Sequence, residues 1–142
     1  MKNARRILSD QSGMTLVEII VVVIIIGLIA GIVGQRAFKQ KEKADEKTAL
    51  AQVSIIKSAI EMYRLDTGSL PSMQQGLQAL IKNPGAEGWD GPYLDGEEIP
   101  KDPWKKPYVY QVPGTGSKDF DIISYGKDGV PGGDGENSDI TK

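Results

Sequence analysis

A long run of apolar side chains is the first pattern in the chain. It extends from Met14 to Gly34, and its one charged residue is Glu18. An α-helix of about 20 residues spans the hydrocarbon core of a bilayer, which is about 30 Å thick. The run therefore predicts a transmembrane helix over residues 14–34.

The segment ahead of this run, residues 1–13, is polar and carries Lys2, Arg5 and Arg6. A secretory signal peptide also has a basic start and an apolar stretch. Here, however, the apolar stretch is longer, contains a carboxylate and continues into a periodic helical pattern. The basic residues favour a cytoplasmic amino terminus, so we expect the bulk of the chain outside the cytoplasm.

Beyond the apolar run the pattern remains helical but changes character. Residues 35–48 carry charges of both signs, which fits a solvated helix face or a segment that faces other subunits. Apolar side chains then recur at spacings of three and four residues, the signature of an amphipathic helix with a core-packing stripe. The members of this stripe are Ala49, Val53, Ile56, Ile60 and Tyr63. No proline occurs from Met14 to Ser69, so we expect one continuous helix to about Asp66, ended by Gly68.

The second half of the chain cannot be mainly helical. All 8 prolines lie between Pro71 and Pro131, and most glycines lie at or after Gly68. Residues 108–112 and 120–124 are rich in β-branched and aromatic side chains and flank the turn-like segment 113–116. We expect an antiparallel pair of strands that packs over the helix stripe, which makes the fold class α+β.

Composition narrows the chemistry that the chain can perform. It contains no Cys and no His, which excludes disulfides, thiol nucleophiles, an imidazole base and Cys or His metal ligands. The formal net charge is -2, from 17 basic and 19 acidic residues, so no basic surplus favours nucleic acid. Carboxylates gather in one glycine-rich segment and not around a catalytic base, so we expect no enzyme activity.

Glu18 is the most informative residue of the apolar run. A carboxylate inside a membrane costs a few kcal/mol on insertion scales, so it needs a partner or access to interfacial water. If the chain is cut between Gly13 and Met14, a new amino group appears four residues before Glu18. An amine and a carboxylate attract strongly at low dielectric constant.

Gly13 followed by Met14-Thr15-Leu16-Val17-Glu18 resembles the type III signal of type IV pilins and type II secretion pseudopilins. The resemblance implies that residues 1–13 are a leader, which a prepilin peptidase removes after Gly13 before the Met14 amine is methylated. It also implies that Glu18 pairs with the amine of a neighbouring subunit during assembly. The family usually begins its mature chain with Phe, so Met14 is a departure that keeps an apolar side chain.

Further along, the resemblance narrows to the major pseudopilin family. Residues 75–80 resemble its short second helix, with Ser72 as the expected N-cap, and residues 91–108 are similar to the loop that leads into its first strand. In that family Trp is commonly followed by Gly, whereas Lys105 and Lys106 follow Trp104 here, so the resemblance leaves the type of the local turn open. Trp89 and Trp104 are expected to pack the core.

The last segment, residues 124–140, alternates carboxylates with glycines. Taken alone it fits either a disordered tail or an oxygen-only metal loop, which suits Ca²⁺ better than Mg²⁺ and does not match the EF-hand spacing. Its resemblance to the calcium loop of the major pseudopilin implies a structural Ca²⁺. The expected ligands are the side chains of Asp128, Asp134 and Asp139 and the backbone carbonyls of Tyr125 and Val130, with Glu136 in reserve.

Together these features predict a pilin-like α+β fold in which a long amino-terminal helix packs on a small antiparallel sheet. The expected segments are a leader (1–13), a transmembrane or fibre-core helix (14–34), an amphipathic helix (35–67) and a periplasmic globular domain (68–142).

The resemblance implies a single-pass protein of the bacterial inner membrane that polymerises into a periplasmic pseudopilus and helps drive folded exoproteins through the outer-membrane secretin. Expected partners are other copies of the chain, minor pseudopilins, prepilin peptidase, the inner-membrane assembly platform and inner-membrane lipid before assembly, with no nucleic acid. A type IV pilin or a minor pseudopilin is the alternative, although pilins usually close a carboxy-terminal loop with Cys. A binding module for exoproteins stays open.

Overall fold

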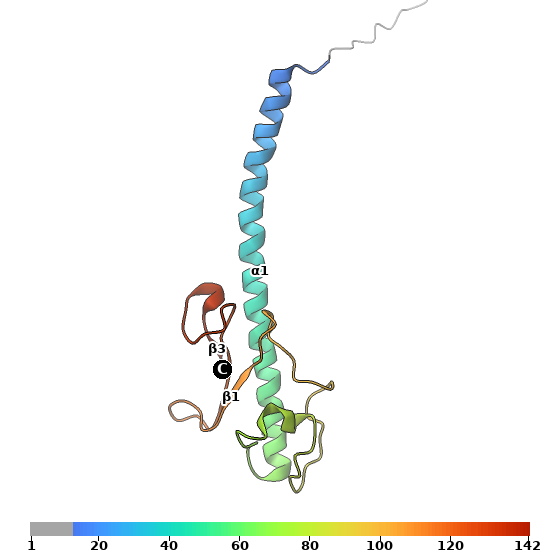
Figure 1. Ribbon diagram of the computed structural model, residues 1–142, viewed down its shortest axis with the longest axis vertical. Helices are drawn as coiled ribbons and strands as arrows, with labels where there is room; N and C mark the ends of the chain where they lie inside the picture. Colours follow the sequence, from blue (N-terminus) through green and yellow to red (C-terminus); the bar gives the residue numbers. More distant parts are fainter. Residues whose placement is uncertain (1–12) are drawn as a thin grey trace, which may run out of the picture. The chain divides into compact units, whose positions relative to one another are not determined.

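The computed structural model describes residues 13–142, and one long helix dominates it (Figure 1). Helix α1 spans Leu16–Thr67, and the remaining elements are short. They are the 3₁₀-helices η1 (Gly76–Leu80) and η2 (Gly135–Asn137) and the strands β1 (Val109–Gln111), β2 (Asp121–Ser124) and β3 (Ile140–Thr141). The predicted continuous helix is confirmed, and so is the absence of further long helices in the described part of the second half.

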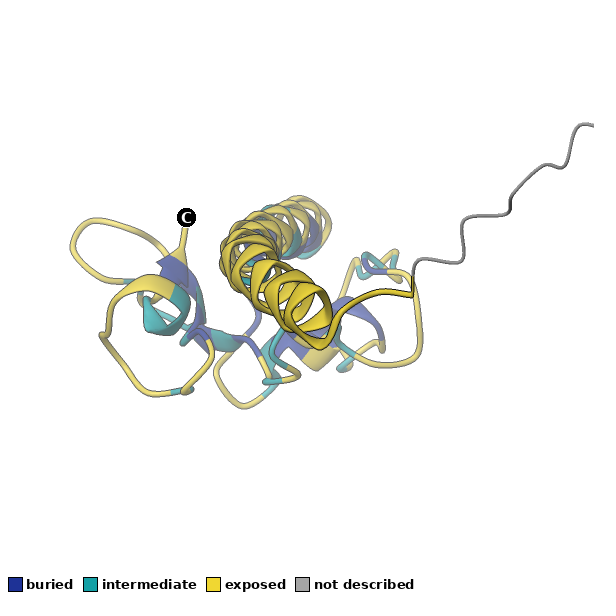
Figure 2. Ribbon diagram, turned by 90° about the horizontal axis from the view of Figure 1, so that it is seen from above, coloured by how far each residue is buried: buried dark blue, intermediate teal, exposed yellow. Residues whose placement is uncertain are grey.

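The described chain divides into two compact units. The first ends at Lys39, and the second begins at Gln40. The first unit contains the apolar part of α1, whose large side chains are exposed throughout (Figure 2). Among the described helices, α1 is the one long and apolar enough to cross a membrane, and its most apolar stretch is not buried. Gly27, Gly31 and Gly34 do not interrupt the helix. This unit therefore presents an apolar surface that needs lipid or other protein around it.

The second unit, Gln40–Lys142, folds around the carboxy-terminal stripe of α1. Val53, Ile56 and Ile60 have no exposed surface, and Tyr63 is 1% exposed. They form one cluster with side chains from η1, β1 and β2, notably Leu80 and Ile122. Burial of one such aliphatic side chain stabilises the fold by about 1.5–3 kcal/mol. The predicted packing of the helix stripe against a small sheet is confirmed.

The sheet has three antiparallel strands in the order β1-β2-β3. Val109 lies opposite Ile123 and Gln111 opposite Asp121, so the predicted pairing of the two central segments is confirmed. Strand β3 was not predicted. It consists of only two residues, and it forms because Ile140 lies opposite Ser124 after the chain has turned back. Two residues carry no alternation that a sequence pattern could reveal.

The chain leaves α1 and enters η1 through specific polar contacts. Gly68 has a positive φ of 76° and donates its backbone N–H to the Arg64 carbonyl at 2.8 Å, as expected for a glycine that ends a helix. Ser72 Oγ accepts the Gln75 N–H at 3.2 Å, while Gln75 Oε1 accepts the Ser72 N–H at 2.9 Å. This reciprocal pair closes the turn ahead of η1, but the N-cap of this 3₁₀-helix is Gln75, so the prediction of Ser72 as its N-cap is wrong.

Aromatic residues close the core around the end of α1. The Tyr93 ring packs edge-on against Tyr63 and Trp89, with centroid separations of 5.7 and 5.6 Å. Burial raises the pKa of Tyr110 to about 12, so its hydroxyl stays protonated and donates to the Pro71 carbonyl at 2.9 Å. Trp89 thus packs on the core as predicted. Trp104 does not belong to the core cluster, which corrects the expectation for that residue.

Asp121 is a buried carboxylate that fixes the turn before β2. It is 1% exposed, and its Oδ2 accepts hydrogen bonds from the backbone N–H and the hydroxyl of Thr115 at 2.6 and 2.5 Å. The pKa of Asp121 therefore lies below its ordinary value of 3.8. The hydrogen bond from the Thr115 hydroxyl is the largest cause, followed by that from the Thr115 N–H, and the nearby Lys118 ammonium also lowers the pKa. The folded protein therefore stabilises the ionised form of this carboxyl group.

We predict that the free energy of unfolding falls as the pH drops below about 4, through the folded-state pKa of Asp121. A depressed pKa means that the unfolded chain binds the proton more tightly, so the Asp121 contribution is fully present above the ordinary value of 3.8 and is lost below it. The measurement is urea unfolding of the detergent-solubilised protein between pH 2 and 6, followed by tryptophan fluorescence. Thr115→Val should flatten this part of the profile, and an unchanged profile would contradict the assignment.

Candidate functional site

The amino-terminal motif forms the cap of α1. Thr15 lies just before the helix, where its Oγ1 accepts the Glu18 N–H at 3.2 Å and its carbonyl accepts the Ile19 N–H, also at 3.2 Å. The spacing Thr-x-x-Glu is that of a capping box. Glu18 lies in the first turn, where the positive end of the helix dipole favours a carboxylate. Two residues of the motif thus have a structural role within a single chain.

The cap also determines where the helix starts relative to the predicted cleavage point. Gly13 and Met14 precede the helix and are exposed, and the Met14 side chain is 70% exposed. The bond between them therefore lies outside the helical hydrogen-bond ladder, where a peptidase could reach it. The rest of the predicted leader, residues 1–12, lies outside the described residues.

The carboxy-terminal acidic segment forms a closed loop. Its base is the pairing of Ser124 with Ile140, and one step further the Lys127 N–H donates to the Glu136 carbonyl at 2.8 Å. The Lys127 ammonium also forms an ion pair with the Glu136 carboxylate, which raises the pKa of Lys127. Glu136, the predicted reserve ligand, therefore has a lysine partner in this structure. The segment therefore forms a folded loop and not a disordered tail.

Two of the three predicted aspartate ligands accept hydrogen bonds from the backbone of the loop itself. Asp128 Oδ1 accepts the Val130 N–H at 3.2 Å, and Asp139 Oδ2 accepts the Gly132 N–H at 3.0 Å. The Tyr125 carbonyl accepts the Gly129 N–H at 3.1 Å. Within residues 13–142, no three carboxylates converge as a ready metal cluster. The carboxylates lie around one loop, and a shared ion would require them to turn inward.

Gly126 shows how tightly the loop is folded. Its φ is 62°, and a Cβ atom at this position would lie 2.6 Å from the Glu136 carbonyl oxygen and 3.0 Å from that of Ser138. Only glycine combines this backbone conformation with so close an approach. The first turn of the loop therefore lies directly against the backbone of η2 and of Ser138, the residue that follows it.

The loop residues suit a hard cation by the chemistry of their donors. Carboxylate and carbonyl oxygens are the ligands that Ca²⁺ takes in groups of six to eight. Besides Lys127, which pairs with Glu136, a second lysine contacts the loop: the Lys106 ammonium donates to the Asp128 backbone carbonyl at 2.6 Å. Sequence analysis assigned no role to Lys106, because a lysine in a polar turn is ordinarily solvated.

Asp102 holds the turn that carries Lys106. This carboxylate is 4% exposed; its Oδ1 accepts the N–H groups of Trp104 and Lys106 at 3.1 and 2.7 Å, and its Oδ2 accepts the Ser124 hydroxyl at 2.6 Å. The carboxylate thereby joins the turn to the end of β2, where the acidic loop begins. Asp before Pro is a frequent turn former through such bonds, so the dipeptide Asp102-Pro103 was an available signal that sequence analysis did not use.

Trp104 lies between this turn, α1 and the acidic loop. It lines a small cleft of about 210 Å³ together with Glu42, Glu46, Glu136 and Ile140. Its indole N–H is buried and has no hydrogen-bond acceptor in the described part of the chain. Trp104 therefore stabilises the contact between helix and loop and not the central core.

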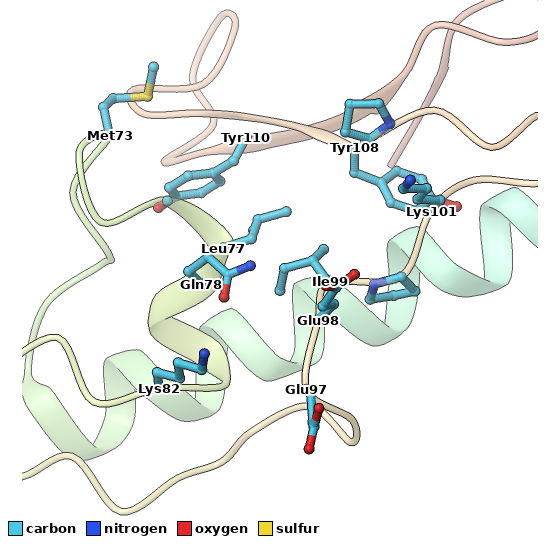
Figure 3. Close-up of a pocket in the computed structure, with 13 residues that line it drawn as sticks. Met73, Leu77, Gln78, Lys82, Glu97, Glu98, Ile99, Lys101, Tyr108 and Tyr110 are labelled. Atoms are coloured by element: carbon cyan, nitrogen blue, oxygen red, sulfur yellow. The ribbon is translucent and has the colours of Figure 1, made fainter.

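A larger open cleft of about 730 Å³ lies on the globular unit (Figure 3). Leu77, Ile99 and Tyr110 contribute its apolar part, and Lys82 and Glu98 lie at its polar part, whereas Glu97 points away. Two tyrosine hydroxyls border the cleft, and both already donate hydrogen bonds within the fold. That of Tyr108 donates to Gln52, and that of Tyr110 donates to the Pro71 carbonyl. No local sequence pattern predicts this cleft, because its lining comes from three separate segments.

The long exposed helix, the small antiparallel sheet and the capped Thr-x-x-Glu motif define a pilin-like subunit. A family profile for type II secretion system protein G matches residues 36–142, and a profile for the prokaryotic N-terminal methylation motif matches residues 8–34. The chain therefore belongs to the type II secretion system protein G family. The predicted family is confirmed, and a type IV pilin or minor pseudopilin is not favoured.

Individual relatives agree with this family. The chain is 43% identical to the type II secretion system core protein G of Pseudomonas aeruginosa over 137 residues, which cover 92% of this chain and 94% of the relative. It is 38% identical to that of Vibrio cholerae over 144 residues, with coverages of 99% and 94%. The crystal structure of the major pseudopilin of enterohaemorrhagic Escherichia coli matches with a TM-score of 0.59 and 35% identity, covering 72% of this chain and 89% of that one. These relatives are structural subunits of the secretion system.

The turn after Trp104 keeps the conformation that glycine would adopt there. Lys105 has a φ of 66°, the one positive value at a non-glycine residue in the described chain. Its N–H donates to the Asp102 carbonyl at 2.8 Å, while the Asp102 N–H donates to the Lys106 carbonyl at 2.9 Å. Lys105 therefore adopts a left-handed conformation at a cost of about 1–2 kcal/mol, at the position that follows Trp104.

We predict that Lys105→Gly raises the free energy of unfolding by about 0.5–1 kcal/mol, because relief of the left-handed conformation exceeds the added entropy of the unfolded chain. Denaturant unfolding in detergent, followed by the fluorescence of Trp89 and Trp104, measures the change. Lys101→Gly is the matched control, since Lys101 has no positive φ and pairs with Pro107 in an isolated bridge; this variant should lose about 0.5–1 kcal/mol. Equal effects of the two substitutions would contradict the prediction.

Proposed function

We propose that the chain is the major structural subunit of a type II secretion pseudopilus, a fibre that helps to drive folded exoproteins through the outer-membrane secretin. The single observation that carries this proposal is the presence of both family profiles in one chain, the methylation motif followed directly by protein G. The exposed apolar half of α1 supports it physically. A surface of this kind is stable in lipid and, after assembly, among identical helices.

Processing is the first step of the proposed mechanism. Prepilin peptidase would cut after Gly13 and leave Met14 as the amino terminus, with its amine methylated. Lys2, Arg5 and Arg6 would hold the leader in the cytoplasm, so that the globular unit lies in the periplasm and α1 crosses the inner membrane once. The exposed peptide between Gly13 and Met14, ahead of the helix cap, supports this cleavage position.

Assembly is the second step. Cleavage places a positive amine at the amino-terminal end of α1, where the helix dipole disfavours a cation. Glu18 would compensate this charge by pairing with the amine of a neighbouring copy as the subunit moves from lipid into the fibre. At low dielectric constant an unpaired carboxylate is costly, so the pair would select the correct axial position of each incoming subunit. Minor pseudopilins and the inner-membrane assembly platform are the further partners expected for this step.

Calcium is the third component of the proposal. The side chains of Asp128, Asp134 and Asp139 and the carbonyls of Tyr125 and Val130 would hold a structural Ca²⁺ that keeps the loop in one conformation. The support is the all-oxygen donor set, the closed loop and the cationic contact that Lys106 already makes with it. When bound, the ion would supply positive charge that removes repulsion among the carboxylates.

We expect Glu18→Ala to abolish fibre formation while leaving membrane insertion and cleavage intact, because the variant keeps its apolar segment and leader but leaves the amine unpaired. Sheared fibres from cells that contain the secretion machinery would be counted by electron microscopy, and mass spectrometry would give the mature amino terminus. Val17→Ala truncates the neighbouring side chain without removing charge and should assemble normally. Normal fibres from Glu18→Ala would refute the pairing, and a chain that retains Met1 would refute the processing.

We expect Asp128→Ala to remove the stabilisation that calcium gives the globular unit. At a calcium concentration of 100 times the dissociation constant, binding adds about 2.7 kcal/mol to the free energy of unfolding. The measurement is the melting temperature in detergent with calcium and with a chelator. Asp95→Ala, which removes an exposed carboxylate outside the loop, should keep the calcium response. Equal melting temperatures of the wild type under both conditions would refute the calcium site.

A further inference from the structure

An open cleft at the carboxy-terminal end of α1 combines apolar and acidic side chains. Its volume is about 410 Å³, and Met62, Leu65 and Pro92 contribute its apolar part. The charged residues that line it are Asp66 and Asp90, and both are acidic. Within residues 13–142 neither carboxylate forms an ion pair. The cleft therefore suits an apolar side chain that brings cations with it.

Tyr93 holds the two carboxylates of the cleft in place. Its hydroxyl donates to Asp66 Oδ2 at 2.9 Å and accepts the Asp90 N–H at 3.0 Å. Its ring packs edge-on against Tyr63, which is 1% exposed and belongs to the core of the globular unit. The shape of the cleft therefore depends on the folded core and not on a surface loop alone.

Residues 35–41 of α1 have the complementary character. Phe38 lies in this segment with 72% of its surface exposed. Gly34 and Gly31 precede it by four and seven residues, so they share its face of the helix, and a Cβ atom at either position would meet nothing within 4 Å. The ring thus stands free next to a bare stretch of helix. The charged residues of the segment are all basic: Arg36, Lys39 and Lys41.

We propose that the cleft receives Phe38 of a second copy of the chain, and that basic side chains of residues 36–41 of that copy pair with the two carboxylates. A chain cannot fill its own cleft, because about 40 Å of continuous helix separates Phe38 from Leu65 at the usual rise per residue. The inference rests on the proposed fibre and adds a contact between copies that are displaced along its axis.

Size, charge and repetition favour a second copy over other occupants. An apolar cavity of about 150 Å³ holds benzene, so this cleft has room for a phenylalanine ring. Three cations meet two carboxylates, and their attraction strengthens as the contact excludes water. An anionic lipid surface would be repelled by the same carboxylates. Each copy provides both the segment and the cleft, so the contact is of the head-to-tail kind that generates a filament.

Phe38→Ala tests the apolar part of the contact. We expect the fibre yield in cells that contain the secretion machinery to fall about tenfold or more, because the ring is buried only in the fibre. The melting temperature of the detergent-solubilised variant should equal that of the wild type, because Phe38 is exposed in the single chain. Met73→Ala truncates another exposed apolar side chain, at the larger cleft, and should form fibres at the wild-type level. A wild-type fibre yield from Phe38→Ala, or a lowered melting temperature, would refute the contact.

Carbodiimide cross-linking of sheared wild-type fibres tests the charged part. The reagent activates a carboxylate, which a neighbouring lysine amine attacks to form an amide. We expect mass spectrometry to find Lys39 or Lys41 joined to Asp66 or Asp90 in fibres, and not in the detergent-solubilised protein before assembly. The length of α1 between these residues means that such a link joins two copies.

The outcomes separate this inference from the function on which it rests. If fibres form but these links are absent, or if the same lysines join Glu97 or Glu98 beside the larger cleft, the fibre stands and the proposed contact is refuted. Links from the two cleft carboxylates to an exported protein would also refute it, in favour of a different occupant. If the wild type forms no fibres, both the proposed function and this contact are refuted.

Discussion

The burial of one stripe of α1 is the interaction on which the rest of the globular unit depends. Val53, Ile56, Ile60 and Tyr63 are inaccessible to solvent because η1 and the sheet pack on them. The sheet has strands of only two to four residues, which would not be stable without a helix to cover one face. The helix thus contributes the largest continuous apolar surface of this core, and every polar turn is arranged around its end.

The same helix also has an apolar surface that the described residues do not bury. Its amino-terminal half contains the apolar residues from Leu16 to Val33, all exposed, and has no partner in the described chain. Within residues 13–142 this surface stays exposed to solvent. Membrane insertion followed by polymerisation is a physical solution to this problem, which is why the proposed function follows from an absence of intramolecular packing as much as from the motif.

Buried carboxylates organise the parts of the globular unit that have no regular structure. Asp121 holds the turn before β2, and Asp102 connects the Lys105-Lys106 turn with Ser124 at the end of that strand. Each of these two carboxylates accepts several hydrogen bonds at once, as a buried acidic group must. The two acids lie at opposite ends of β2, so one four-residue strand connects the hairpin turn, the lysine turn and the acidic loop.

The sequence by itself determined the long helix, its stop at Gly68, the two central strands and the family, because periodicity, proline placement and a contiguous motif are local signals. It also indicated the acidic loop and its candidate oxygen ligands. Only the tertiary structure decided that β3 pairs with β2, that Trp104 lies outside the core, that Glu136 faces Lys127 and that Lys106 reaches Asp128. These contacts join residues that are far apart in the chain or too few to form a pattern. Closing these loops costs conformational entropy, which the tertiary contacts offset, and no local sequence preference records those contacts.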